Sequence, residues 1–176
     1  MIRRNLLRIL PLTAFAMAAN AHATVYLTVE QAQAVMFPNA RLIPSFRDLR
    51  PAEIDAIRKA SGSAPLSKQL QAWRAQDGGW FIVDRVVGKH EFITYAVALT
   101  PQGIVRDVEI LEYRETYGGE IRNPNWRAQF VGKRFGSQLQ LGKDIKNISG
   151  ATLSSRHVTD GVRRLIATYQ TVLSKA

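Results

Sequence analysis

The sequence predicts an α+β fold, an antiparallel sheet with packed helices that include a long C-terminal helix. Three observations predict this class. A length of 176 residues suits one domain with an apolar core. Stretches rich in aromatic and β-branched residues alternate with turn signals over 80–113. Near the C-terminus, apolar residues recur at helical spacing: Val158, Val162, Leu165, Ile166, Tyr169, Val172 and Leu173.

The first residues are typical of a secretory signal. Arginines are followed by an apolar stretch over 9–19 and by Ala21-His22-Ala23, which places small residues around a larger one. An uncleaved anchor is the alternative, but the stretch is shorter than the roughly 20 residues of a spanning helix. We therefore expect 1–23 to be a signal peptide and the mature protein to be soluble and exported, in a periplasm or an equivalent space.

Two helices are predicted in the segment 24–76, which we expect to be mainly helical. Thr28-Val29-Glu30-Gln31 fits a capping box, and this helix should run to about Met36, before Pro38. Pro51 suits the first turn of a second helix, which Ser61-Gly62 should end. The residues after it, 63–69, resemble a linker.

Strands are predicted next, joined by turns at Asp77-Gly78-Gly79, Gly88-Lys89 and 100–103. The last three strands should form an antiparallel meander, with both faces of the sheet covered because 95–99 is apolar at successive positions. The strands are 69–76, 80–87, 91–99 and 104–113.

A short helix should separate the meander from the C-terminal helix. Asn123-Pro124 has the pattern of a cap followed by proline in the first turn. Trp126 and Phe130 then share one face, and Gly132 should end the helix.

Composition excludes several kinds of chemistry. The chain has no cysteine and three histidines, which excludes thiolate metal ligands and cysteine nucleophiles and disfavours a histidine metal site. Its net charge is +10. In an exported protein this charge suits an acidic protein partner, an anionic membrane surface or a phosphate-bearing ligand, and we expect no nucleic-acid partner.

The segment Ser149-Gly150-Ala151-Thr152-Leu153-Ser154-Ser155 has the chemistry of a phosphate site. We expect the long helix to begin directly after it, and helix N-termini stabilise anions through unpaired N–H groups. Gly150 and Ala151 let a ligand approach the backbone, while Thr152, Ser154 and Ser155 supply hydroxyls. The alternative is that Ser149 or Thr152 only caps the helix.

The motif Ser149–Val158 resembles that of the FMN-binding domain family. The family includes the flavin-bearing C subunit of the sodium-pumping NADH:quinone oxidoreductase and the G subunit of the Rnf complex. The resemblance implies FMN as cofactor, joined through its phosphate to Thr152 by a separate flavin transferase. It implies that Ser149, Ser154 and Ser155 hydrogen-bond the phosphate, and that 77–176 is the FMN-binding domain.

A second stretch, Glu115-Thr116-Tyr117-Gly118-Gly119, also matches, so the resemblance spans about Trp80 to Ile166. It implies that Glu115, Thr116 and the backbone of Gly118 and Gly119 line the ring or the ribityl chain. Tyr117 or Trp126 could stack on the isoalloxazine ring, and the alternative for each is packing in the core or at the rim. His157 is interpreted as a helix-surface residue.

Two positions differ from the family pattern. Tyr117 stands where many members have proline. Lys146 stands where covalently loaded members usually have an aspartate, and the nearest preceding acid is Asp144.

The resemblance and two missing patterns together predict an electron carrier. The chain shows no nicotinamide-binding glycine fingerprint and no acid–base pair, so no catalytic residue is assigned. The expected partners are redox proteins associated with a membrane. An exported flavin-dependent reductase of a small substrate and a non-redox ligand-binding module are the alternatives.

Overall fold

A computed structural model describes residues 24–115 and 117–175, so the predicted signal peptide lies outside the described residues. The strands are β1 (Thr24–Val25), β2 (Leu42–Pro44), β3 (Arg47–Asp48), β4 (Gln69–Ala75), β5 (Trp80–Val87), β6 (Phe92–Leu99) and β7 (Val105–Tyr113). The α-helices are α1 (Val29–Met36), α2 (Pro51–Ser61), α3 (Pro124–Arg127) and α4 (Thr152–Thr171). Short 3₁₀ helices are η1 (Gly119–Arg122), η2 (Ala128–Phe130) and η3 (Leu173–Lys175).

The sheet confirms the predicted α+β class. Its order is β1-β7-β6-β5-β4-β2, with β3 also paired to β4, and every pairing is antiparallel. The meander from β5 to β7 is confirmed, and β4 extends it. The segment 24–76, expected to be mainly helical, adds four strands to this sheet as well as two helices.

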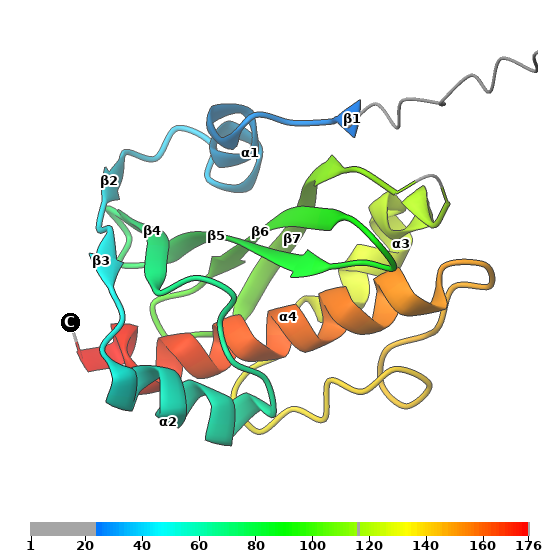
Figure 1. Ribbon diagram of the computed structural model, residues 1–176. Coiled ribbons are helices and arrows are strands. Elements are labelled where there is room, and N and C mark those ends of the chain that lie inside the picture. The colour runs from blue at the N-terminus through cyan, green and yellow to red at the C-terminus, as the bar shows by residue number, and fades with distance from the viewer. Residues whose placement is uncertain (1–23, 116, 176) are drawn as a thin grey trace, which may run out of the picture.

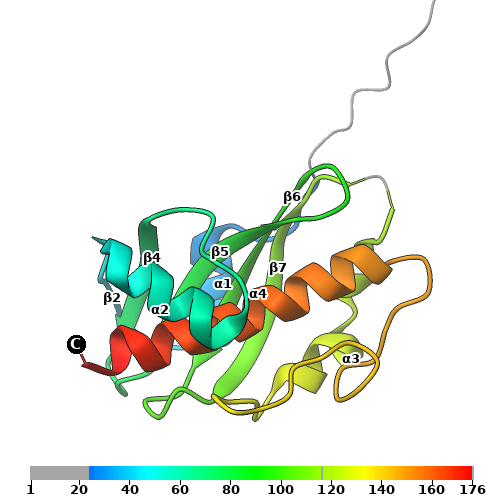
Figure 2. The same ribbon diagram turned by 60° about the horizontal axis from the view of Figure 1, so that its bottom comes forward.

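Helices cover both faces of the sheet, as the apolar run over 95–99 predicts. Figure 1 shows α1 on one face and α4 on the other, with α2 packed beside α4; Figure 2 shows the same layers from another angle. Ile82, Tyr95 and Val97 belong to the core on the α4 side, whereas Phe81 and Ala96 belong to the core on the α1 side.

The predicted helix ends are largely confirmed. Thr28 and Gln31 make the two reciprocal hydrogen bonds of a capping box at the start of α1. Pro51 lies in the first turn of α2, and Gly62 ends that helix with a left-handed backbone. The third predicted helix is shorter than expected, because after Arg127 the chain tightens into η2.

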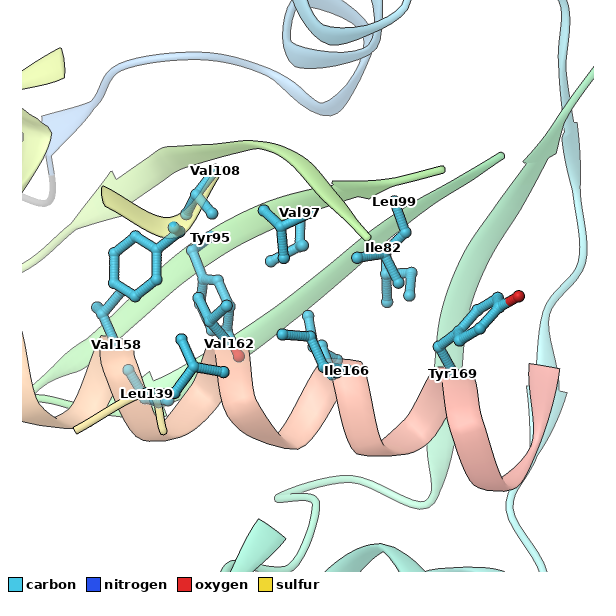
Figure 3. Close-up of a cluster of buried hydrophobic side chains, with 14 of the residues drawn as sticks. Ile82, Tyr95, Val97, Leu99, Val108, Leu139, Val158, Val162, Ile166 and Tyr169 are labelled. Atoms are coloured by element: carbon cyan, nitrogen blue, oxygen red, sulfur yellow. The ribbon is translucent and has the colours of Figure 1, made fainter. Parts of the chain in front are cut away.

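Helix α4 packs along the sheet through one apolar stripe. Figure 3 shows Val158, Val162 and Ile166 projecting from α4 toward the strands, where they meet the buried side chains of Tyr95 and Val97. Burial of one such side chain stabilises a fold by about 1.5–3 kcal/mol. No helix in the described ranges is both long enough and apolar enough to cross a membrane.

Helix α4 closely approaches the sheet at Gly161. A Cβ atom there would overlap the Tyr95 hydroxyl and lie 2.8 Å from Tyr95 Cζ. Beside it, the buried Arg164 guanidinium binds Asp84 Oδ2 at 2.7 Å, and Tyr95 donates to the same oxygen at 3.2 Å. The close contact and the ion pair together fix the position of α4 along β5 and β6.

We expect Gly161→Ala to destabilise the protein by about 1–3 kcal/mol, because the added methyl group overpacks this contact. Urea denaturation would measure the loss. Alanine is favoured over glycine in a helix by about 1 kcal/mol, so a loss here cannot come from helix propensity. In the Tyr95→Phe background, which lacks the overlapped hydroxyl, Gly161→Ala should lower the free energy of unfolding by less. An equal cost in both backgrounds would contradict this account.

Candidate functional site

A cavity of about 600 Å³ lies where the β5–β6 turn, the chain after β7 and the first turn of α4 meet. This volume is in the range of cofactor sites. In Figure 1 the orange start of α4 lies near the end of the sheet at which β5 and β6 are joined. The cavity is lined by Lys89, His90, Glu115, Tyr117, Gly150, Ala151, Thr152, Leu153 and Ser154.

The start of α4 differs from the expectation. The helix begins at Thr152 and not after Ser155, so the hydroxyl residues form its first turn. Its N-cap is Ala151, which has no capping side chain, and this excludes Ser149 and Thr152 as simple caps. Within the described part of the chain, the N–H groups of Thr152, Leu153 and Ser154 have no acceptor. An anion at this point would satisfy them.

The four hydroxyl residues of the motif face different surroundings. Thr152 is exposed, and its Oγ1 accepts a hydrogen bond from Asn147 Nδ2 at 3.0 Å. Ser154 is buried and shares a 2.9 Å hydrogen bond with the Tyr113 hydroxyl. Ser155 is fully buried and donates to the Ala151 carbonyl at 2.8 Å. Thr152 and Ser154 line the cavity, whereas Ser149 and Ser155 do not.

Glu115 lines the cavity and also holds the β5–β6 turn. Its Oε1 accepts from the backbone N–H of His90 at 2.5 Å and of Glu91 at 2.9 Å. Partial burial alone would raise the pKa of Glu115, but the hydrogen bonds from Glu91, His90 and Lys89 outweigh it and lower the pKa. Glu115 is therefore an anion whose charge is largely taken up by backbone donors.

Of the other described residues in the second motif, one lines the cavity and two line a hollow beside it. Tyr117 is 83% exposed and lines it. Gly118 and Gly119 line a neighbouring hollow together with Tyr117 and Gly150. Thr116 lies outside the described residues.

Of the two candidates for stacking on a ring, only Tyr117 lies at the cavity. Trp126 is buried in the core against Phe130, with ring centroids 5.1 Å apart. Its Nε1 donates to the Lys146 carbonyl at 2.8 Å, which holds the chain leading to the motif. Trp126 therefore does not line the cavity but supports, from the core, the segment that leads to the motif.

Asp144 does not take the place of the family aspartate. It accepts from Lys133 Nζ at 2.8 Å and from the backbone N–H groups of Leu139 and Gln140. Partial burial opposes the charge, but these donors lower the pKa of Asp144 to about 2. The Asp144 carboxylate is thus bound within its own loop. The exposed Lys146 occupies the position at which covalently loaded members of the family usually have an aspartate.

Sequence reasoning missed several residues around the cavity. Lys89 was predicted only as part of a turn, and His90 and Asn147 were not singled out. His157, interpreted as a surface residue, is half-buried, and its Nδ1 lies 3.1 Å from the Gly88 carbonyl oxygen. One signal was available: in an antiparallel meander the β5–β6 turn and the end of β7 lie at the same end of the sheet.

One family profile matches the part of the chain that holds the cavity. Residues 88–167 match the profile of the FMN-binding domain family. This match confirms the resemblance carried by the two motifs and confirms FMN as the predicted cofactor. The match begins at the β5–β6 turn and ends within α4, so it contains every residue that lines the cavity.

Solved structures confirm the fold. The chain is similar to the C subunit of the Na⁺-translocating NADH-quinone reductase from Parabacteroides distasonis, with a TM-score of 0.53 and 15% sequence identity. The similarity covers 84% of this chain and 86% of that protein. A comparison with the sequences of curated proteins finds no match.

We expect Asp144→Asn to lower the free energy of unfolding by about 2 kcal/mol at pH 7, from the difference between a usual pKa near 3.8 and the native value of about 2. A lowered native pKa stabilises the fold above the unfolded pKa, and this stabilisation is lost as pH falls from about 4 toward 2. The difference in free energy of unfolding between wild type and Asp144→Asn, measured by urea titration, should therefore be smaller at pH 3 than at pH 5.

The exposed pair of Asp55 and Arg58 provides the control, since surface ion pairs contribute little. Asp55→Asn should leave the free energy of unfolding nearly unchanged at both pH values. A gap for Asp144→Asn that stays constant with pH would contradict the assigned role of its carboxylate.

Proposed function

We propose that this chain is an exported electron-transfer protein whose FMN is attached through a phosphoester to Thr152. The observation that carries the proposal is the position of Thr152: an exposed hydroxyl in the first turn of α4, on the wall of a cavity within the family-matched region. The quinone reductase component with the same fold supports a redox role. The partners would be redox proteins associated with a membrane.

Among the motif hydroxyls, Thr152 is the best suited to carry the bond. Ser155 is buried, with its hydroxyl bound to the helix backbone, and Ser154 is buried against Tyr113. Thr152 Oγ1 accepts from Asn147, which leaves its own proton free to be removed. A phosphate on this oxygen would lie next to the unpaired N–H groups of the helix start.

Attachment needs chemistry that the described residues do not supply. Oγ1 must displace a leaving group from an activated flavin phosphate, such as a phosphoanhydride, and give up its proton. No carboxylate or imidazole among the described residues is hydrogen-bonded to Thr152 Oγ1. We therefore assign the base and the activated donor to a separate flavin transferase, which would have to accept Lys146 in place of the family aspartate.

When bound, FMN would supply the redox chemistry, and the protein would hold and expose it. The arrangement fits this group: donors for an anion at the helix start, a cavity of suitable volume, and the basic residues Lys89 and His90 in the cavity lining. Tyr117 and Leu153, both exposed, would flank the opening.

We expect Thr152→Ala to abolish covalent flavin in protein produced with its transferase, whereas Thr152→Ser should keep part of it. Intact mass should show wild type heavier by one FMN less one water. Flavin-free Thr152→Ala should lose only about 0.5–1.5 kcal/mol of stability relative to flavin-free wild type, because it removes a single exposed hydrogen bond. Thr171, at the other end of α4, provides a matched control.

Thr171→Ala removes the same kind of side chain from the same helix and should leave flavin loading unchanged. If the Thr152→Ala protein carries covalent FMN in full, attachment at Thr152 is wrong. Flavin that leaves wild type completely on acid precipitation would show that the attachment is non-covalent.

Export predicts a defined N-terminus. Strand β1 begins at Thr24 and pairs with Tyr113 and Glu112 of β7, so cleavage after Ala23 would leave the described fold complete. We expect N-terminal sequencing of protein from its native host to begin at Thr24, in the exported soluble fraction. Recovery from membranes with Met1 retained would overturn this part of the proposal.

A further inference from the structure

The β5–β6 turn is held by side chains that are distant in sequence. Glu115 accepts from the backbone N–H of His90 and Glu91, and His157 of α4 lies against the Gly88 carbonyl. Within the turn, Gly88 N donates to Glu91 O at 2.7 Å. A Cβ atom on Gly88 would lie 2.6 Å from Glu115 Oε1, so the clamp needs glycine there.

This clamp determines which charges line the cavity. Lys89 and His90, at the tip of the turn, both line it. Among the described residues, Glu115 is the one acidic member of the lining, and its Oε1 is bound to two backbone N–H groups. In the described part of the chain, the cavity lining therefore has no acidic side chain free of backbone hydrogen bonds that could neutralise the Lys89 ammonium.

A cation at this place would act on a bound flavin. When an oxidised flavin takes up two electrons and one proton, its ring becomes an anion with one negative charge. A nearby positive charge stabilises that anion relative to the neutral oxidised ring. The phosphate has its own donors at the start of α4, which leaves the cation of the turn available to the ring.

We propose that Lys89 is a flavin-facing cation that raises the reduction potential of the bound FMN, and that Glu115 is a positioning residue that holds Lys89 in place. The proposal rests on the proposed function, because it requires FMN in this cavity. It assigns to Glu115 a role that acts through the turn and not through contact of its own charge with the ring.

The first test measures the reduction potential of flavin-loaded protein, titrated with dithionite against a reference dye. Lys89→Gln should make reduction about tenfold less favourable, which is about 30 mV for a two-electron couple. Lys89→Arg keeps the charge and should stay close to wild type. Lys175→Gln removes an exposed lysine of η3, which follows the C-terminal end of α4, and should leave the reduction potential unchanged.

Substitution of Glu115 distinguishes a direct effect of its carboxylate on the flavin from an effect through Lys89, because the two change the reduction potential in opposite directions. If the carboxylate acted directly on the ring, its removal would raise the potential. If it positions Lys89, Glu115→Ala should lower the potential in the direction of Lys89→Gln, and the double variant should fall no further. Glu115→Gln keeps an acceptor oxygen for the turn and should not reproduce this drop.

A second measurement does not need flavin. In the flavin-free Thr152→Ala protein, adding Glu115→Ala should speed hydrogen exchange at the amides of His90 and Glu91 at least tenfold. Unchanged exchange would overturn the clamp, whatever the protein binds. Failure to bind FMN at all would overturn the proposed function and leave this measurement readable.

If FMN binds but Lys89→Gln does not alter the potential, the cation role is wrong while the proposed function stands. Loss of FMN loading in Lys89→Gln with an unchanged potential in the remaining loaded protein would show that Lys89 contacts the phosphate. That result would likewise overturn the inference.

Discussion

The contact between α4 and the sheet at Gly161 is the constraint on which the site depends. Only a residue without a side chain fits over Tyr95, and the ion pair of the buried Arg164 with the partly buried Asp84 fixes the helix beside it. Because an α-helix is rigid over such distances, fixing its middle also fixes its first turn. Thr152 and its neighbours are thereby placed at the end of the sheet where the β5–β6 turn and the chain after β7 also lie.

Much of the fold could be predicted because its long elements have strong patterns. The meander, the capping box at Thr28 and the apolar stripe of α4 are local signals, and tertiary packing reinforces them. Strands β1, β2 and β3 have two or three residues each and exist only through their partners in the sheet. No local pattern can indicate such pairings, which explains why the first third was expected to be mainly helical.

The candidate site was predictable in outline but not in the orientation of its side chains. The motif identifies the hydroxyl residues, but the position at which the helix begins determines which of them face outward. Since α4 begins at Thr152, helical geometry leaves Thr152 exposed and turns Ser154 and Ser155 into the core. Lys89 and His90 could be found only by combining the meander with the position of Glu115, because no motif marks them.

Two acidic residues of the matched region have their negative charge compensated by neighbouring donors. Glu115 is bound to backbone donors of the β5–β6 turn, and Asp144 is bound to Lys133 and to backbone donors of its own loop. Glu115 stabilises the turn that lines the cavity, and Asp144 stabilises the loop that precedes the motif. Both have a lowered pKa because these donors favour their charged forms. Their negative charge is thus largely compensated by the framework. The helix start and the basic turn then provide the positive potential that an anionic cofactor requires.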